Sequence, residues 1–202
     1  ANLWRWVIYN PTLLERQVDK LWMQALDGRE PSDAYYWLRA RDMLDGDVAK
    51  AARTFLLNRL CYNGLYRVNS DGGFNVPYGK LKNPNLGFSA IHAISAAAKK
   101  LRVIVHYGDF EDALIAAADL EAPIGCYYVD PPYLPLEATS FDQYAWPRFL
   151  EDDHIRLAAR VAQLYEGPNY VVGSNAWCER SLELYRRPPF DTAEVEMRRN
   201  IN

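Results

Sequence analysis

Short apolar runs alternate with amphipathic helical segments throughout the second half of the chain. Four runs rich in Val, Ile and Tyr are predicted strands, at residues 102–107, 124–129, 170–173 and 193–197. Helices are predicted between and after them, at residues 89–100, 111–119, 152–165 and 177–186. This alternation favours an α/β sandwich around a mostly parallel sheet. In that architecture, ligands bind beyond the carboxyl ends of the strands.

The first part of the chain carries helical signals before any convincing strand. One helix is broken near Asn10-Pro11 and resumes as far as Asp27-Gly28, a second starts at Pro31, and a third starts near Asp47. Turn signals then become dense between residues 63 and 85. They separate two β-favouring pieces, 65–68 and 74–76, and indicate a hairpin region that exposes basic and aromatic side chains. Loops on a rigid scaffold are where binding residues concentrate.

Charge is distributed unevenly along the chain. The 202 residues carry a formal net charge of −3. Residues 50–82 hold six basic side chains against one acidic, a local charge of +5, which leaves −8 on the remainder. A basic segment in an acidic protein suggests a local anionic partner such as phosphate. The alternative is a solvated helix face.

Several classes of protein are not expected from this sequence. No apolar stretch approaches the ~18 residues of a membrane span, and the first residues lack the basic-then-apolar order of a signal peptide. Cys61, Cys126 and Cys178 form no C-x-x-C pair, so a reduced intracellular protein without a zinc site is expected. His154 follows the acidic run at 151–153 and is interpreted as part of a solvated helix start. The opening without Met, in mid-helical pattern, suggests a fragment.

The motif Asp130-Pro131-Pro132-Tyr133 directly follows an apolar predicted strand. Asp130 offers a carboxylate acceptor at the strand end, and the two prolines keep the backbone extended and remove N–H donors. Tyr133 supplies a flat face for stacking. Acceptors beside a stacking ring suit the exocyclic amine of a planar base, although a β-to-α turn that merely contains two prolines is the plainer interpretation.

This tetrapeptide resembles the catalytic signature of the amino-group DNA methyltransferases that use S-adenosylmethionine. A second resemblance is more specific: residues 58–67 (NRLCYNGLYR) and 73–79 (GFNVPYG) look like the target-recognition segment of Dam-type adenine methyltransferases. Weaker matches follow in the same order at residues 108–110, 149–157, 172–175 and 198–201. The resemblance covers nearly the whole chain.

The resemblance implies a fold and different functions for two parts of the chain. The fold would be α/β, a Rossmann-like methyltransferase sandwich with a mostly parallel sheet and an inserted helical and hairpin target-recognition subdomain. Residues 1–28 and 86–202 would form the catalytic core, incomplete at its N-terminus, and residues 29–85 the target-recognition subdomain. The implied reaction is methylation of adenine N6 in duplex DNA after the base is flipped into the site.

The resemblance also implies roles for individual residues. The catalytic positions would be Asp130, Pro131, Pro132 and Tyr133. The wall of the S-adenosylmethionine site would include Gly108, Asp109, Phe110 and Asp130. No metal is implied.

The resemblance also implies DNA contacts for residues in the predicted hairpin region. Arg67 would bind a guanine edge, Tyr62 would wedge into the base stack, and Asn63 would hold the displaced strand or a phosphate. Leu65 and Pro77 would make apolar contacts, Pro77 near a thymine methyl, and Lys80 and Lys82 would bind phosphates. Tyr62 and Leu65 could instead be hydrophobic anchors, and Arg67 a phosphate contact. A GATC target is the default expectation.

The chain departs from this family at its beginning. The Gly-rich strand-to-helix turn of the cofactor site and the acidic residue after it are missing, so weak or absent cofactor binding by this chain is a hypothesis. The alternative function is a non-catalytic or truncated DNA-binding relative, and methylation of cytosine N4 is a further possibility. The expected partner is double-stranded DNA in the cytoplasm of a bacterial, archaeal or phage-infected cell, in restriction-modification or another role, with no membrane and no obligate protein partner.

Overall fold

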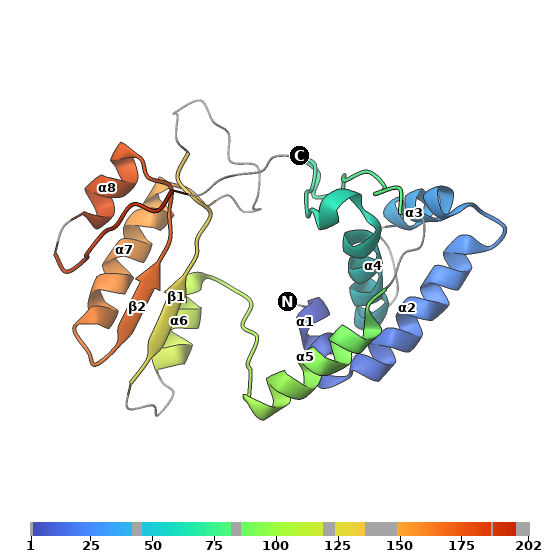
Figure 1. Ribbon diagram of the computed structural model, residues 1–202, viewed down its shortest axis with the longest axis horizontal. Coiled ribbons are helices and arrows are strands. Elements are labelled where there is room, and N and C mark those ends of the chain that lie inside the picture. Colours follow the sequence, from blue (N-terminus) through green and yellow to red (C-terminus); the bar gives the residue numbers. More distant parts are fainter. Residues whose placement is uncertain are drawn as a thin grey trace. The chain divides into compact units, whose positions relative to one another are not determined.

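Two compact units divide the chain, residues 1–107 and residues 108–202. The computed structural model describes residues 2–41, 46–81, 86–118, 124–135, 149–186 and 188–196 (Figure 1). The first unit is helical, and the second combines helices with a small parallel sheet.

The helices of the first unit begin where the sequence carries helix-start signals. They are α1 (Asn2–Tyr9), α2 (Pro11–Leu26), α3 (Pro31–Arg39), α4 (Asp47–Leu60) and α5 (Phe88–Lys100), with the short 3₁₀ turn η1 (Tyr62–Gly64) after α4. The Asn10 side chain accepts a hydrogen bond from the Leu13 amide at 3.2 Å, and Pro11 occupies the first position of α2. The predicted break between α1 and α2 is therefore confirmed.

A single apolar core holds the first unit together. Helix α4 packs against α1 and α2, and α5 packs against α1. Leu14, Leu56 and Leu60 are completely buried there, and each such side chain stabilises the fold by about 1.5–3 kcal/mol. This core is the rigid base from which residues 61–81 project.

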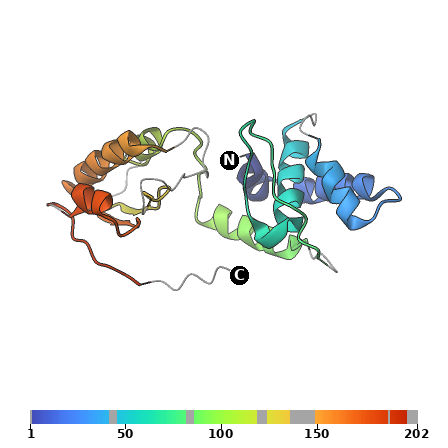
Figure 2. The same cartoon turned by 90° about the horizontal axis from the view of Figure 1, so that it is seen from above.

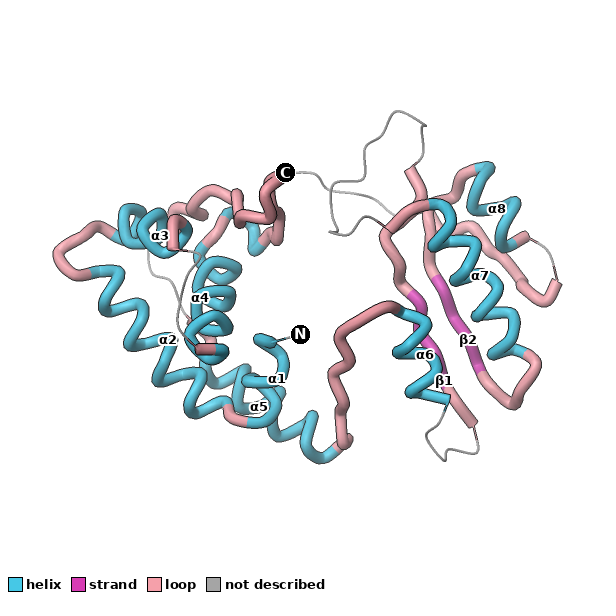
Figure 3. The backbone as a smooth tube through the Cα atoms, turned by 180° about the vertical axis from the view of Figure 1, so that it is seen from behind, coloured by secondary structure: helices cyan, strands magenta, loops and turns pink. Residues whose placement is uncertain are grey.

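The second unit contains a parallel two-stranded sheet with helices on one face. Strand β1 (Cys126–Val129) pairs with β2 (Tyr170–Gly173), so that Val129 lies opposite Gly173. Helix α6 (Phe110–Ala118) precedes β1, α7 (Glu151–Tyr165) precedes β2, and α8 (Glu179–Tyr185) follows β2. Figures 2 and 3 show α6 and α7 on the same face of the strands. The prediction of a mixed α/β fold with a parallel sheet is confirmed at this level.

Two predicted strands are not strands in the structure. Residues 102–107 and 193–196 are irregular, and residue 197 lies outside the described residues. Ile104 is 73% exposed and Val195 is 75% exposed. A strand exists only where a neighbouring strand satisfies its backbone groups, and within the described residues neither run is paired with one.

Candidate functional site

The residues that follow β1 and β2 meet at one edge of the sheet. Because the strands are parallel, Asp130 and Ser174 both leave their strands at this edge. The Ser174 amide donates to the Val129 carbonyl at 3.1 Å, which extends the pairing by one residue. The sequence motif at 130–133 is thus placed next to residues 174–175.

The Asp130 carboxylate is held by one of its oxygens. The Ser174 hydroxyl donates to Asp130 Oδ1 at 2.7 Å. Asp130 Oδ2 has no hydrogen-bond partner among the residues that the structure describes, and the residue is exposed. One carboxylate oxygen is therefore oriented while the other is open to a donor from outside.

The two prolines leave little backbone with which to hold the turn. Pro131 and Pro132 have no N–H, so the Leu134 amide is the next anchoring point shown, and it donates to Asn175 Oδ1 at 3.0 Å. Leu134 is buried, whereas Tyr133 is 37% exposed. The Tyr133 ring is accessible for stacking, which the predicted role requires.

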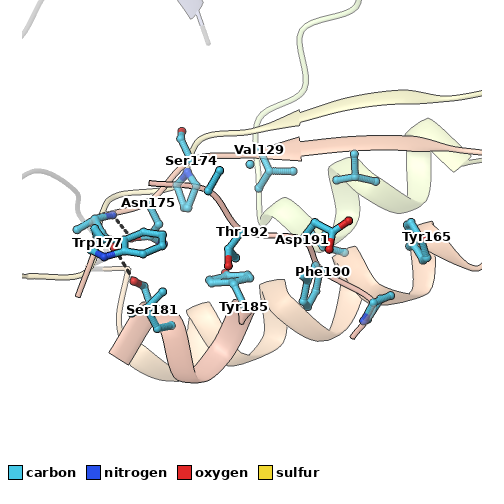
Figure 4. Close-up of a pocket in the computed structure, with 18 residues that line it drawn as sticks. Val129, Tyr165, Ser174, Asn175, Trp177, Ser181, Tyr185, Phe190, Asp191 and Thr192 are labelled. Carbon is cyan, nitrogen blue, oxygen red and sulfur yellow. Dashed lines mark hydrogen bonds between the residues drawn. The ribbon is translucent and has the colours of Figure 1, made fainter. Parts of the chain in front are cut away.

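A cavity of about 360 Å³ lies beside this turn, between the strand ends and helices α7 and α8 (Figure 4). Val129 of β1 and Pro131 of the turn after it line the cavity, as do Tyr185 of α8 and Phe190 and Asp191 of the segment after α8. Burial raises the pKa of Tyr185. Ser174 and Asn175 also line the cavity, which therefore adjoins the turn that carries Asp130.

The predicted cofactor-side residues begin helix α6. Asp109 Oδ1 accepts the Glu111 amide at 2.9 Å, and Asp109 Oδ2 is 3.0 Å from Arg156 Nη2. The Arg156 guanidinium also lies 4.8 Å from the centre of the Phe110 ring. Hydrogen bonding to Arg156 lowers the pKa of Asp109. Both Asp109 and Phe110 are thus engaged by one arginine of α7.

Residues 61–81 form a hairpin-like arm, and six of the seven predicted DNA-contacting residues are exposed on it. The arm closes through two isolated antiparallel bridges, Cys61↔Tyr78 and Val68↔Phe74. Lys82 lies outside the described residues. The exposed positions are Tyr62, Asn63, Leu65, Arg67, Pro77 and Lys80.

Buried polar contacts fix the base of the arm to α3. The Tyr35 hydroxyl donates to the Val76 carbonyl at 2.7 Å, and Arg39 Nη1 donates to the same oxygen at 3.2 Å. Tyr35 and Val76 are buried, and the ring centres of Tyr35 and Tyr78 are 5.5 Å apart. The arm is therefore carried by the helical core and not by its own two bridges.

One predicted recognition side chain is pre-oriented within the arm. Arg67 Nε donates to Asn75 Oδ1 at 2.8 Å, and the Asn75 amide donates to the Arg67 carbonyl at 3.0 Å. The two terminal nitrogens of Arg67 have no partner among the described residues, and the side chain is exposed. This leaves the planar end of the guanidinium available for a bidentate acceptor.

The structure gives contacts to residues for which the sequence predicted no role. Ser174 and Asn175, which belong to the weak family match at 172–175, contact the turn at 130–134, and Tyr35 and Arg39 support the arm. The carboxyl-end rule for parallel strands is the signal that points to Ser174 and Asn175. Within the described part of the chain, no group of three or more His, Cys, Asp and Glu side chains could hold a metal ion, and no helix there has the length and apolar character to cross a membrane.

Known proteins resemble this chain over most of its length. It is 38% identical over 180 residues to a type II methyltransferase, M1.LlaDCHI, of Lactococcus lactis subsp. cremoris, covering 85% of this chain and 61% of that protein. It is 40% identical over 185 residues to the type II methyltransferase M.MjaIII of Methanocaldococcus jannaschii, covering 88% and 61%. The DNA adenine methylase of Escherichia coli K12 is 32% identical over 173 residues, covering 85% and 59%.

The chain spans about three-fifths of the length of these curated relatives. The model of one family, described as D12 class N6 adenine-specific DNA methyltransferase, matches residues 1–201. On the motif at the sheet edge, the arm and this match, the chain belongs to the D12 class of N6 adenine-specific DNA methyltransferases.

Proposed function

We propose that this chain supplies the DNA-recognition arm and the amine-binding turn of an enzyme that methylates adenine N6 in duplex DNA. The observation that carries the proposal is the Asp130 carboxylate, anchored by Ser174 through Oδ1 and open at Oδ2, in the same short turn as the exposed Tyr133. Membership in the N6 adenine-specific family supports adenine N6 as the atom that is methylated.

The turn suits an amine that must become a nucleophile. The N6 amine of a flipped adenine would donate to Asp130 and to the Pro131 carbonyl, while the base stacks on Tyr133. These bonds orient the nitrogen lone pair away from the protein acceptors. When N6 gains the methyl group, one of its protons would pass to the Asp130 carboxylate, to which the amine would already be hydrogen-bonded. Positioning and electrostatics supply the acceleration.

S-adenosylmethionine, when bound, would supply a methyl group activated on a positively charged sulfur. Among the described residues, the Phe110 ring would offer an apolar face to this group, beside the Arg156 guanidinium that lies against it; the open oxygen of Asp130 would remain for the N6 amine. Asp109 is already engaged by Arg156, so it would have to share its carboxylate. Gly108, Asp109, Phe110 and Asp130 are the residues that we propose line this part of the site.

The arm would read the DNA sequence. Arg67 would bind a guanine through its terminal nitrogens, with Pro77 near a thymine methyl, and Tyr62 would fill the space left by the flipped base. Asn63 and Leu65 would complete the contact, and Lys80 and Lys82 would bind phosphates. Within this proposal the target is GATC.

The wider architecture is also part of the proposal. The two described strands would belong to a Rossmann-like sandwich, with residues 1–28 and 86–202 as the core. Residues 29–85 would be the inserted recognition subdomain. The firm attachment of the arm to α3 supports treating α3, α4 and the arm as one functional segment.

A second candidate is a DNA-binding relative without catalysis. One observation favours it: Asp109 and Phe110 are both in contact with Arg156. Such a protein would retain the arm and bind duplex DNA without transferring a methyl group.

A methyl-transfer assay decides between these candidates. The chain is incubated with labelled S-adenosylmethionine and unmethylated duplex containing GATC, and the digested DNA is analysed for N6-methyladenine and N4-methylcytosine. Asp130→Ala should lower the rate by about 10²–10³-fold, in line with loss of one preorganised group. Asp112→Asn, which changes an exposed carboxylate of α6, is the matched control. DNA binding without transfer would identify the second candidate, and N4-methylcytosine would overturn the adenine assignment.

Base recognition is tested separately by equilibrium binding. The comparison duplex has another base in place of the guanine. Arg67→Ala should lower the ratio of the affinities for GATC and for this duplex by a factor of about 5 to 150, the range for one bidentate contact. Lys80→Ala should weaken binding to both duplexes by the same factor. If Arg67→Ala lost the same factor in affinity for both duplexes, Arg67 would be a phosphate contact and not a base contact.

A further inference from the structure

We infer that Ser174 and Asn175 are positioning residues for the amine-binding turn, which they hold from the neighbouring strand. The inference rests on the proposed function, because it concerns the same site. It adds two residues after β2 that act through Asp130 and Leu134.

The turn is poorly able to hold itself. Between Asp130 and Leu134, the two prolines contribute no N–H donors. The hydrogen bonds that the structure shows to the Asp130 side chain and the Leu134 amide both come from residues 174–175, at 2.7 Å and 3.0 Å. One of these hydrogen bonds therefore lies at each end of the turn, and the two prolines between them donate none.

Ser174 limits how the carboxylate can rotate. Its hydroxyl has one proton, and that proton is donated to Asp130 Oδ1. The Ser174 backbone is itself fixed by its amide, which donates to the Val129 carbonyl at 3.1 Å. Oδ1 therefore has a defined position, and Oδ2 is the oxygen presented to an incoming amine.

Asn175 is oriented by two backbone donors. Its Oδ1 accepts the Leu134 amide at 3.0 Å and the Ala176 amide at 2.8 Å. Rotating the side-chain amide by half a turn would lose both bonds, so the orientation is fixed. Asn175 Nδ2 is consequently buried without a partner among the described residues, which is a cost to stability. A residue that keeps this cost while anchoring the turn is consistent with a positioning role.

Hydrogen exchange tests the clamp without any turnover or cofactor. In Asn175→Ala, exchange of the Leu134 amide should accelerate about tenfold, as expected for loss of one hydrogen bond. The Tyr170 amide, which donates to the Gly125 carbonyl at the opposite end of the sheet, should not change. Equal acceleration of both amides would indicate general loosening of the unit, and no acceleration at Leu134 would show that the bond does not form; either result overturns the inference.

Amine discrimination tests whether Ser174 acts through Asp130. With the target base placed opposite an abasic site in both duplexes, so that flipping breaks no base pair, the wild-type chain should bind the GATC duplex about tenfold more tightly than one carrying purine, which lacks the exocyclic amine. Ser174→Ala should reduce this ratio to about threefold or less, and Ser174→Thr, which retains the hydroxyl, should restore it. Ser89→Ala on the exposed start of α5 is the matched control. In the methyl-transfer assay, Ser174→Ala should lower kcat by a larger factor than it raises KM for DNA, because the loss in binding is only about threefold.

The outcomes separate this inference from the proposed function. If the wild-type chain shows no preference for the amine, the proposed function fails, and the exchange result alone decides whether the turn is clamped. If the wild type discriminates and Ser174→Ala discriminates equally well, the proposed function stands and the positioning role is overturned.

Discussion

Replacing Tyr35 with phenylalanine removes one hydroxyl from the base of the arm and leaves its buried ring in place. The Val76 carbonyl loses its 2.7 Å donor but keeps Arg39 Nη1 at 3.2 Å. A hydrogen bond contributes about 0.5–1.5 kcal/mol net, whereas a buried carbonyl left with no donor costs about 1–3 kcal/mol more. Because one donor remains, we expect Tyr35→Phe to lower the free energy of unfolding by about 1 kcal/mol.

The same reasoning predicts a larger loss when both donors are removed. Arg39→Met alone should also cost about 1 kcal/mol, because Tyr35 still donates to the carbonyl. The double variant leaves the buried Val76 oxygen without a donor, so its cost should exceed the sum of the two by about 1–3 kcal/mol. Burial raises the pKa of Tyr35, so its hydroxyl remains a donor at neutral pH.

Urea unfolding followed by far-ultraviolet circular dichroism measures these changes, with unchanged m-values as the check on a common unfolded state. Tyr36→Phe is the control, since Tyr36 is the neighbouring tyrosine of α3 and is 41% exposed; it should stay within about 0.5 kcal/mol of the wild type. A loss of about 3 kcal/mol for Tyr35→Phe alone, or strict additivity in the double variant, would refute the idea that two donors share this carbonyl.

Three further outcomes follow from the geometry. A Cβ at Gly79 would lie 2.6 Å from the Cys61 carbonyl oxygen, so Gly79→Ala should destabilise the chain to urea by about 1–3 kcal/mol; an unchanged midpoint would contradict that close approach. Hydrogen bonding to Arg156 lowers the pKa of the Asp109 carboxyl. The pair therefore stabilises the fold above the unfolded pKa of about 4, and this stabilisation is lost as the pH falls below that value. The difference in free energy of unfolding between the wild type and Arg156→Met should shrink in acid, and a constant difference would argue against the pairing. Cys61 is buried with a raised pKa whereas Cys126 is exposed, so a maleimide should label Cys126 first in the native protein, and faster labelling of Cys61 would contradict its burial.

Local signals predicted the helices and the two paired strands well. The cap at Asn10 with Pro11 after it, and the start at Pro31, act within one helical turn and need no tertiary information. Strand pairing is different, because it depends on a partner far away in the sequence. The run 102–107 has high β propensity, yet without a neighbour in the described residues it remains irregular.

His154 shows how a local pattern can mislead. The acidic run before it suggested a solvated helix start, but His154 is 1% exposed and its ring lies 4.8 Å from the ring of Phe149. Its spacing to Leu157, Ala158 and Val161 places it on the buried face of α7. That periodicity was the better signal, and the expectation of solvation was wrong.

The sequence predicted the motif of the candidate site but not the residues that hold that motif in place. Asp130-Pro131-Pro132-Tyr133 follows a strand, as expected, and Tyr133 is accessible. The bond from Ser174 to Asp130 joins residues 44 apart in the sequence. Such a contact depends on which residues of two strands face each other, which no single-segment pattern specifies.

The pairing of Val129 with Gly173 therefore has a chemical consequence. Side chains alternate between the two faces of a sheet, so sliding one strand by a single residue would turn every side chain of that strand to the other face. Asp130 would then face Gly173 or Asn175 in place of the serine hydroxyl, and the carboxylate would lose its anchor although no atom of the motif had been altered. The register of two four-residue strands thus determines which side chain holds the Asp130 carboxylate.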